Sequence, residues 1–169
     1  MNELMQSILQ SLTQRFQTSA SEFRGQTSLS VSAQHLLAVC QALRDEFGFD
    51  RLVSVTAVDY WPQEEPRFHV VYLFHSLRHN IRLTLRVPVA SSQLALPSLE
   101  TLYPNANWYE REVLDMFGVH FEHHSDLRRI IMPTDWVGHP LRKDYPLGYE
   151  EVRFSFNPEV EESKPHPDE

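Results

Sequence analysis

The chain has 169 residues, of which 41% are hydrophobic and 22% are charged, a composition typical of an ordinary globular domain. Its net charge of −8 argues against a general nucleic-acid or anionic-membrane binder, because such a protein would show a basic face. No apolar run is long enough for a membrane span, and the polar start lacks the cationic region of a secretory signal. We therefore expect a protein on the cytosolic side.

Two amphipathic helices are predicted in the first third of the chain. The first begins behind a cap at Asn2 and has apolar residues at helical spacing, namely Leu4, Met5, Ile8, Leu9, Leu12 and Phe16. Residues 19–28 (SASEFRGQTS) are expected to form a loop, followed by a short strand from Leu29 to Val31. The second helix is predicted from a cap at Ser32 to a stop at Gly48, with Cys40 on its apolar stripe.

Three strands follow, over residues 52–60, 67–76 and 81–89. The third alternates apolar and polar residues, which indicates a strand with one wet face. Because the connections between the strands are short, we expect antiparallel hairpins. The sequence thus predicts an α+β fold in two layers, with helices packed on a mostly antiparallel or mixed sheet.

A third helix is predicted over residues 107–118. Asn107 and Glu110 have the spacing of a capping box, and Gly118 supplies the stop. The apolar stripe of this helix consists of Tyr109, Val113, Met116 and Phe117. That stripe leaves four charged residues on other faces, namely Glu110, Arg111, Glu112 and Asp115.

Beyond Gly118 the chain loses periodicity and gains prolines, which remove backbone donors and stiffen the path. We predict a compact α+β domain over residues 1–121, an extended partner-binding segment over 122–158 and an acidic, disordered tail over 159–169. Residues 136–156 are expected to lack a stable fold of their own and to become ordered on partner proteins.

Residues 110–147 hold seven acids, five Lys or Arg and four His. Arginines lie beside aromatic residues in this stretch, the mixture found in interface hot spots, and prolines fix the relative positions of the charges. An interface is therefore favoured over a merely solvated surface. The aromatic residues concerned are Trp108, Tyr109, Phe117 and Tyr145.

Other kinds of site fit these residues less well than an interface does. A metal set of His120, His123, His124 and His139, with Glu122 or Asp126, has no known ligand spacing, and no HExxH occurs. An acid–base pair or a Mg²⁺ site among Glu110, Glu112 and Asp115 is opposed by Arg111, which lies between them. The single cysteine excludes an intrachain disulfide and the usual ligand set of an iron–sulfur cluster. No Gly-rich loop for a nucleotide occurs.

At EREVLDMFGVHFEHHSDLRRI and GHPLRKDYPL the sequence resembles the C subunit, the 30 kDa-type peripheral-arm subunit, of respiratory complex I, the proton-translocating NADH:quinone oxidoreductase. These two blocks lie in the family's order, and the first two-thirds of the chain resembles the family more weakly. Two positions depart from the family pattern, Leu114 in place of an aromatic residue and Ser125 in place of proline.

The resemblance implies a non-catalytic subunit that supports assembly and the transfer of electrons from NADH to quinone. It implies no catalytic, cofactor or metal residues in this chain, with flavin and iron–sulfur clusters in partner subunits, and a place on the cytoplasmic face of the membrane. The implied partners are chiefly the large D subunit, which borders the quinone cavity, and also the B and I subunits. The implied interface residues are Glu110, Arg111, Glu112, Asp115, Phe117, Asp126, Arg128, Arg129, His139, Pro140, Leu141, Arg142, Lys143, Asp144, Tyr145 and Pro146.

Two alternatives stay open at this point. The same fold serves related membrane-bound hydrogenases and ferredoxin-type or photosynthetic-type complexes, so the parent complex could differ. A metal-dependent hydrolase that uses the His and carboxylate groups is an alternative of another class.

Overall fold

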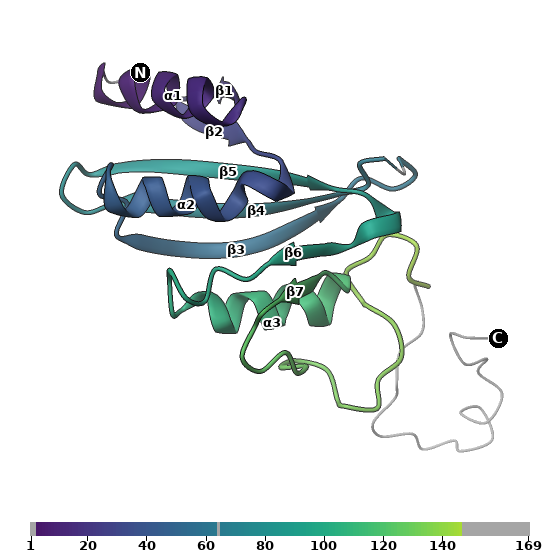
Figure 1. Cartoon of the computed structure of the whole chain (residues 1–169). Helices are drawn as coiled ribbons and strands as arrows, with labels where there is room; N and C mark the ends of the chain where they lie inside the picture. Colours follow the sequence, from purple (N-terminus) through teal and green to yellow (C-terminus); the bar gives the residue numbers. More distant parts are fainter. Residues whose placement is uncertain (1–2, 64, 147–169) are drawn as a thin grey trace, which may run out of the picture.

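A five-stranded mixed sheet forms the centre of the computed structural model, which describes residues 3–63 and 65–146 (Figure 1). The strand order is β1-β2-β5-β4-β3, and a separate small sheet pairs β6 with β7. The elements in chain order are α1 (Glu3–Phe16), β1 (Ser19–Phe23), β2 (Gln26–Ser30), the 3₁₀ turn η1 (Ala33–His35), α2 (Leu36–Asp45), β3 (Arg51–Asp59), β4 (Phe68–Ser76), β5 (Ile81–Val89), the 3₁₀ turn η2 (Ser91–Gln93), β6 (Ala95–Pro97), α3 (Ala106–Phe117) and β7 (His120–Glu122).

Strands β3, β4 and β5 form the expected antiparallel meander, and β1 also pairs with β2 in antiparallel orientation. β2 runs parallel to β5, and β6 runs parallel to β7. The sheet is therefore mixed, and the predicted α+β class is confirmed. No helix among the described residues is long and apolar enough to cross a membrane.

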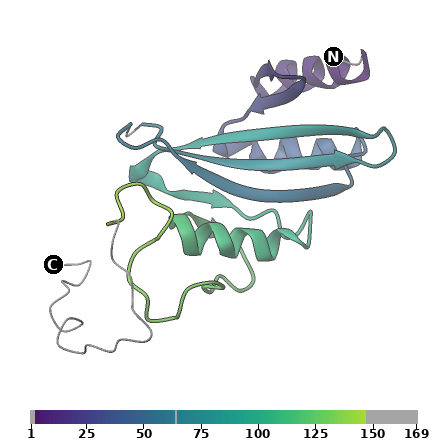
Figure 2. The same cartoon turned by 180° about the vertical axis from the view of Figure 1, so that it is seen from behind.

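Burial alternates along the central strands. In β4, Phe68, Val70, Tyr72 and Phe74 are buried, whereas the residues between them keep part of their surface exposed. These buried side chains form the core together with apolar side chains of α1, α2 and α3. The thiol of Cys40, which was predicted on the apolar stripe of the second helix, is buried in this core. Figure 2 shows the opposite face of β3–β5, which no helix of the described part of the chain covers.

Two sequence predictions are corrected at the N-terminal end of this fold. Residues 19–28 are mostly a β-hairpin rather than a loop, with both turn residues, Arg24 and Gly25, at positive φ (51° and 76°). All five residues of β1 are exposed, so no alternation marks the strand. The second helix begins at Leu36, because η1 takes up the residues after Ser32, whose side chain makes no capping bond.

Candidate partner-binding site

Helix α3 carries two acids, Glu110 and Asp115, whose side chains are completely buried. The sequence pattern separated them from the apolar stripe of the helix, but both are buried, because irregular segments cover the helix on the sides away from the sheet (Figure 1). The predicted capping box is also wrong, since the helix cap is Asn105 and Asn107 lies within the helix. Buried acids need partners, and each of these two binds a different segment.

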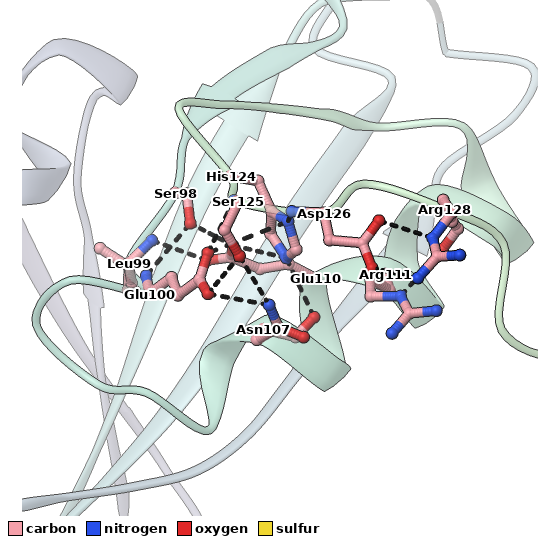
Figure 3. Close-up of polar contacts among 10 residues, drawn as sticks. All are labelled: Ser98, Leu99, Glu100, Asn107, Glu110, Arg111, His124, Ser125, Asp126 and Arg128. Carbon is pink, nitrogen blue, oxygen red and sulfur yellow. Dashed lines mark hydrogen bonds and ion pairs between the residues drawn. The ribbon is translucent and has the colours of Figure 1, made fainter.

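Glu110 joins the loop before α3 to the helix (Figure 3). The Ser98 hydroxyl donates to one carboxylate oxygen at 2.6 Å, and the backbone N–H of Leu99 donates to the other at 2.7 Å. Burial raises the pKa of Glu110, and these two hydrogen bonds offset only part of that rise. The carboxyl group is thus a structural acceptor inside the domain.

Glu100 fixes the start of the segment that follows β7 (Figure 3). It accepts hydrogen bonds from the backbone N–H (2.9 Å) and the hydroxyl (2.6 Å) of Ser125, and from the side-chain amide of Asn107 (2.9 Å). The bonds from Ser125 lower the pKa of Glu100 to about 2. Ser125 was noted as a departure from the family pattern, and here it supplies two donors that a proline would lack.

The side chain of His124 lies fully buried beside this cluster. Its Nδ1 accepts the backbone N–H of Asp126 at 3.0 Å, and its Nε2 lies 3.1 Å from the backbone carbonyl of Asn107. Because a carbonyl can only accept, Nε2 is the donor in the second of these contacts. Both ring nitrogens are therefore engaged by the backbone.

Arg111 holds the next residues from the exposed side of α3. Its guanidinium donates to the backbone carbonyls of Arg128 (3.0 Å) and Arg129 (3.4 Å) and lies 5.1 Å from the centre of the Trp108 ring. Arg128 makes a two-point ion pair with Asp126, with both distances 2.6 Å. These arginines therefore stabilise the segment from its outer side.

Asp115 forms a second anchor, at the other end of α3. One carboxylate oxygen accepts the backbone N–H groups of Ile130 (3.1 Å), Ile131 (2.8 Å) and Met132 (2.9 Å), and the other accepts Arg129 at 2.6 Å. Burial alone would raise the pKa of Asp115, but these donors outweigh it and lower the pKa. Four donors on one carboxylate fix this loop tightly.

Residues 138–146 close the C-terminal end of α3. The backbone N–H of Leu141 donates to the carbonyl of Met116 at 3.1 Å, and Arg142 donates to that of Phe117 at 2.6 Å. His139 Nδ1 lies 3.0 Å from the carbonyl of Asp115. These carbonyls belong to the last turn of the helix, where no backbone N–H of the helix is available to them. The 138–146 segment supplies the missing hydrogen-bond donors.

A buried ion network ties the same segment to the sheet, and sequence reasoning missed it. Asp59, at the end of β3, accepts two bonds from Arg67 and one from the backbone N–H of Lys143, all at 2.9 Å. Arg67 also donates to Asp144 at 2.9 Å. Burial of Asp59 opposes its ionisation, but these donors lower its pKa to about 2. The only sequence signal was an acid that closes an apolar strand and an arginine that opens the next.

The structure distributes the predicted interface residues over three environments. Glu110, Asp115 and Phe117 are buried; Arg111, Asp126, Arg129, His139, Pro140, Arg142 and Tyr145 are partly buried; and Glu112, Arg128, Leu141, Lys143, Asp144 and Pro146 are exposed. The buried acids bind this chain's own segments, so their role toward a partner can only be to position those segments.

The segment of residues 123–146 contains no helix or strand, as the sequence predicted. Residues 136–156 were expected to lack a stable fold of their own, but the backbone N–H groups of Leu141, Arg142, Lys143 and Tyr145 all donate hydrogen bonds within the chain. The predicted segment beyond residue 146 and the predicted tail over 159–169 lie outside the described residues.

Within residues 3–63 and 65–146, no three His, Cys, Asp or Glu side chains gather as a metal-binding group. What the 123–146 segment does present is apolar surface: Ile130, Ile131, Val137 and Leu141 are 38%, 58%, 38% and 54% exposed. Trp108, on α3, is 60% exposed. Sequence reasoning missed Ile130, Ile131 and Val137, whose only signal was apolar residues in a stretch without periodicity.

Gly118 allows the close approach of this segment to α3. Its φ is +77°, and a Cβ atom at this position would lie 2.6 Å from Nε2 of His139. We expect Gly118→Ala to lower the free energy of unfolding by about 1–3 kcal/mol, through backbone strain and displacement of residues 139–142. Urea unfolding measures this, with Gly25→Ala as the control: its φ is also positive, at +76°, but a Cβ there meets nothing within 4 Å. Equal losses in both variants would show that the contact with His139 is unimportant.

The comparisons with known proteins agree on one family. The family model described as respiratory-chain NADH dehydrogenase, 30 Kd subunit, matches residues 29–151. A relative from Roseiflexus sp., named as the C subunit of NADH-quinone oxidoreductase, is 48% identical over 82% of this chain and 80% of its own length. The protein of the same name from Geobacter sulfurreducens is 44% identical over 75% and 78%.

A solved structure has the same fold. The trypsin-resistant fragment (1–134) of Nqo5 superposes with a TM-score of 0.65 at 28% identity, over 73% of this chain and 99% of that one. The family model covers the core strands, helix α3 and the anchored segment described above. The chain therefore belongs to the 30 kDa subunit family of respiratory-chain NADH dehydrogenase, which includes the C subunits of NADH-quinone oxidoreductases.

Proposed function

We propose that this chain is a peripheral-arm subunit of NADH-quinone oxidoreductase that supplies no catalytic group and uses its 123–146 segment to hold neighbouring subunits. One observation carries the proposal: the segment is fixed on the domain by buried acids and ion pairs, yet it exposes large apolar side chains such as Ile131 and Leu141. Exposed apolar groups on a rigid backbone are favourable for binding another protein, because little entropy is lost on association.

The partners that fit best are those implied by the resemblance, chiefly the D subunit at the quinone cavity, with the B and I subunits nearby. In this proposal flavin and the iron–sulfur clusters belong to partner subunits, since the one cysteine, Cys40, is buried in the core. The chain would then lie on the cytoplasmic face of the membrane and reach the membrane only through the complex.

A charge placed on the exposed apolar surface tests this role. We expect Ile131→Asp to lower the amount of assembled complex several-fold, because an unpaired carboxylate would be buried at the interface. Turnover per assembled complex should stay unchanged. Native gels of solubilised membranes, with NADH:quinone activity normalised to complex content, measure both quantities.

The matched control is Phe23→Asp, which puts the same charge on an apolar residue that is 71% exposed in the hairpin of β1 and β2. Thermal unfolding of the purified variants shows whether the domain itself is intact. Normal assembly of Ile131→Asp would contradict the proposed binding surface. Normal assembly with reduced turnover would instead point to a catalytic role for this chain.

A further inference from the structure

A row of basic residues crosses the open face of the sheet. The strand register places Arg51 of β3 opposite His75 of β4, and His75 opposite Arg82 of β5. Directly opposed residues point to the same side of a sheet, so the three side chains share the face that α2 and α3 leave uncovered. Arg78 and His79 follow in the exposed turn between β4 and β5. The turn between β4 and β5 is at one end of the sheet, and the 138–146 segment is at the other end (Figures 1 and 2).

The arginines of this group have no acidic partner in the described part of the chain. Arg51, Arg78 and Arg82 take part in no ion pair there, whereas five other arginines do, namely Arg15, Arg44, Arg67, Arg128 and Arg129. The neighbouring acid is Asp50, whose Oδ1 accepts the backbone N–H of Leu77. The side chain of His75 makes a hydrogen bond with that of Asn80, at 3.3 Å, and no ion pair with a described residue.

The charges of Arg51, Arg78 and Arg82 are thus not neutralised by any acid of the described residues, although the chain as a whole has an excess of acids, with net charge −8. An anionic partner would neutralise them. The surface formed by Arg51, His75, Arg78 and Arg82 is hereafter called the cationic row.

We propose that the cationic row binds an acidic polypeptide segment of a neighbouring subunit. Three adjacent strands span about 10 Å from the first to the third, which suits successive carboxylates on a chain better than one small anion. Leu77, 58% exposed beside Arg78, adds the apolar contact that protein partners use. The row itself contains no Phe, Tyr or Trp on which nucleic-acid bases could stack. The inference rests on the proposed role as a subunit of a complex.

Zero-length crosslinking of the intact complex tests this directly. A carbodiimide joins a lysine amine to a carboxylate in contact with it, and the chain has only two lysines, Lys143 and Lys164. The variants Arg82→Lys and Arg51→Lys keep the charge and introduce a reactive amine in the row. Arg24→Lys, in the exposed turn between β1 and β2, is the matched control.

We expect both row variants to give crosslinks to Asp or Glu of one neighbouring subunit, and the control to give none to that peptide. Crosslinks to the chain's own acidic residues between Glu150 and Glu169 would overturn the proposal, as would crosslinks no different from the control. If the chain without these substitutions does not co-purify with the complex, that result contradicts the proposed function and not the cationic row alone.

Charge reversal gives an independent measurement. In the double variant Arg51→Glu/Arg82→Glu, the subunit retained in the complex after a moderate-salt wash should fall by about threefold or more, since several exposed ion pairs reverse sign. Binding of the purified chain to vesicles with anionic lipid, lost in the same variant, would overturn the proposal in favour of a membrane contact. Unchanged retention would also overturn it.

Discussion

Replacing Asp115 by alanine is expected to cost about 3–5 kcal/mol of unfolding free energy and to free the loop of residues 129–132. The substitution removes one carboxylate that accepts three backbone N–H groups and one guanidinium group. Each partly buried donor left without an acceptor costs about 1–3 kcal/mol, and water reaches some of them after the change. Urea unfolding gives the free energy, and hydrogen exchange at the amides of Ile130, Ile131 and Met132 reports the loop.

Two further variants show whether the loss comes from the hydrogen bonds of Asp115, from its charge, or from removing any acid of α3. Glu112→Ala removes an exposed acid from the same helix and should change stability by about 0.5 kcal/mol or less. Asp115→Asn keeps one oxygen acceptor but loses the charge that binds Arg129, so its cost should lie between the two. A loss in Asp115→Ala no larger than that of Glu112→Ala would show that the loop holds itself in place without this anchor.

The central fold could be predicted because its signals are local. Alternation of apolar residues marked β4 and β5, and the positive φ of Gly118 matched its expected stop after α3. Strand β1 was missed because all its residues are exposed, so burial imposes no period on them. The parallel pairing of β2 with β5 joins residues more than fifty positions apart, and no local pattern encodes such a pairing.

The irregular course of the segment after β7 could be predicted, but the burial of the acids that hold it could not. The irregular course after β7 followed from prolines and missing periodicity, and residues 123–146 indeed form no helix or strand. Glu110 and Asp115 were assigned to faces other than the apolar stripe of α3, and charged residues are rarely fully buried unless they are paired. Their partners lie 11 to 17 positions away, and Asp59 meets Lys143 across 84 positions. The pairing that reverses the expectation is therefore tertiary.

A loss of unfolding free energy of similar size, about 3–5 kcal/mol, is expected for Arg67→Ala. The side chain of Asp59 is 1% exposed and would lose the one ion pair that it makes with the described residues, and removal of one member of a buried pair leaves the other charge unsatisfied. Asp144 would lose its contact with the sheet at the same time. Arg82→Ala is the control, because it removes an exposed strand arginine that makes no ion pair with the described residues.

The expected exchange pattern distinguishes a docked segment from a merely weaker domain. In Arg67→Ala the amides of Leu141, Lys143 and Tyr145 should exchange much faster than in the parent chain. The exchange rates of amides in the core of β4 should rise only as far as the loss of global unfolding free energy requires. Within the assembled complex the difference at residues 141–145 should shrink, because neighbouring subunits then also hold the segment. Uniform acceleration across β4 and residues 141–145 would contradict a local role for Arg67 and assign the ion network to the stability of the domain as a whole.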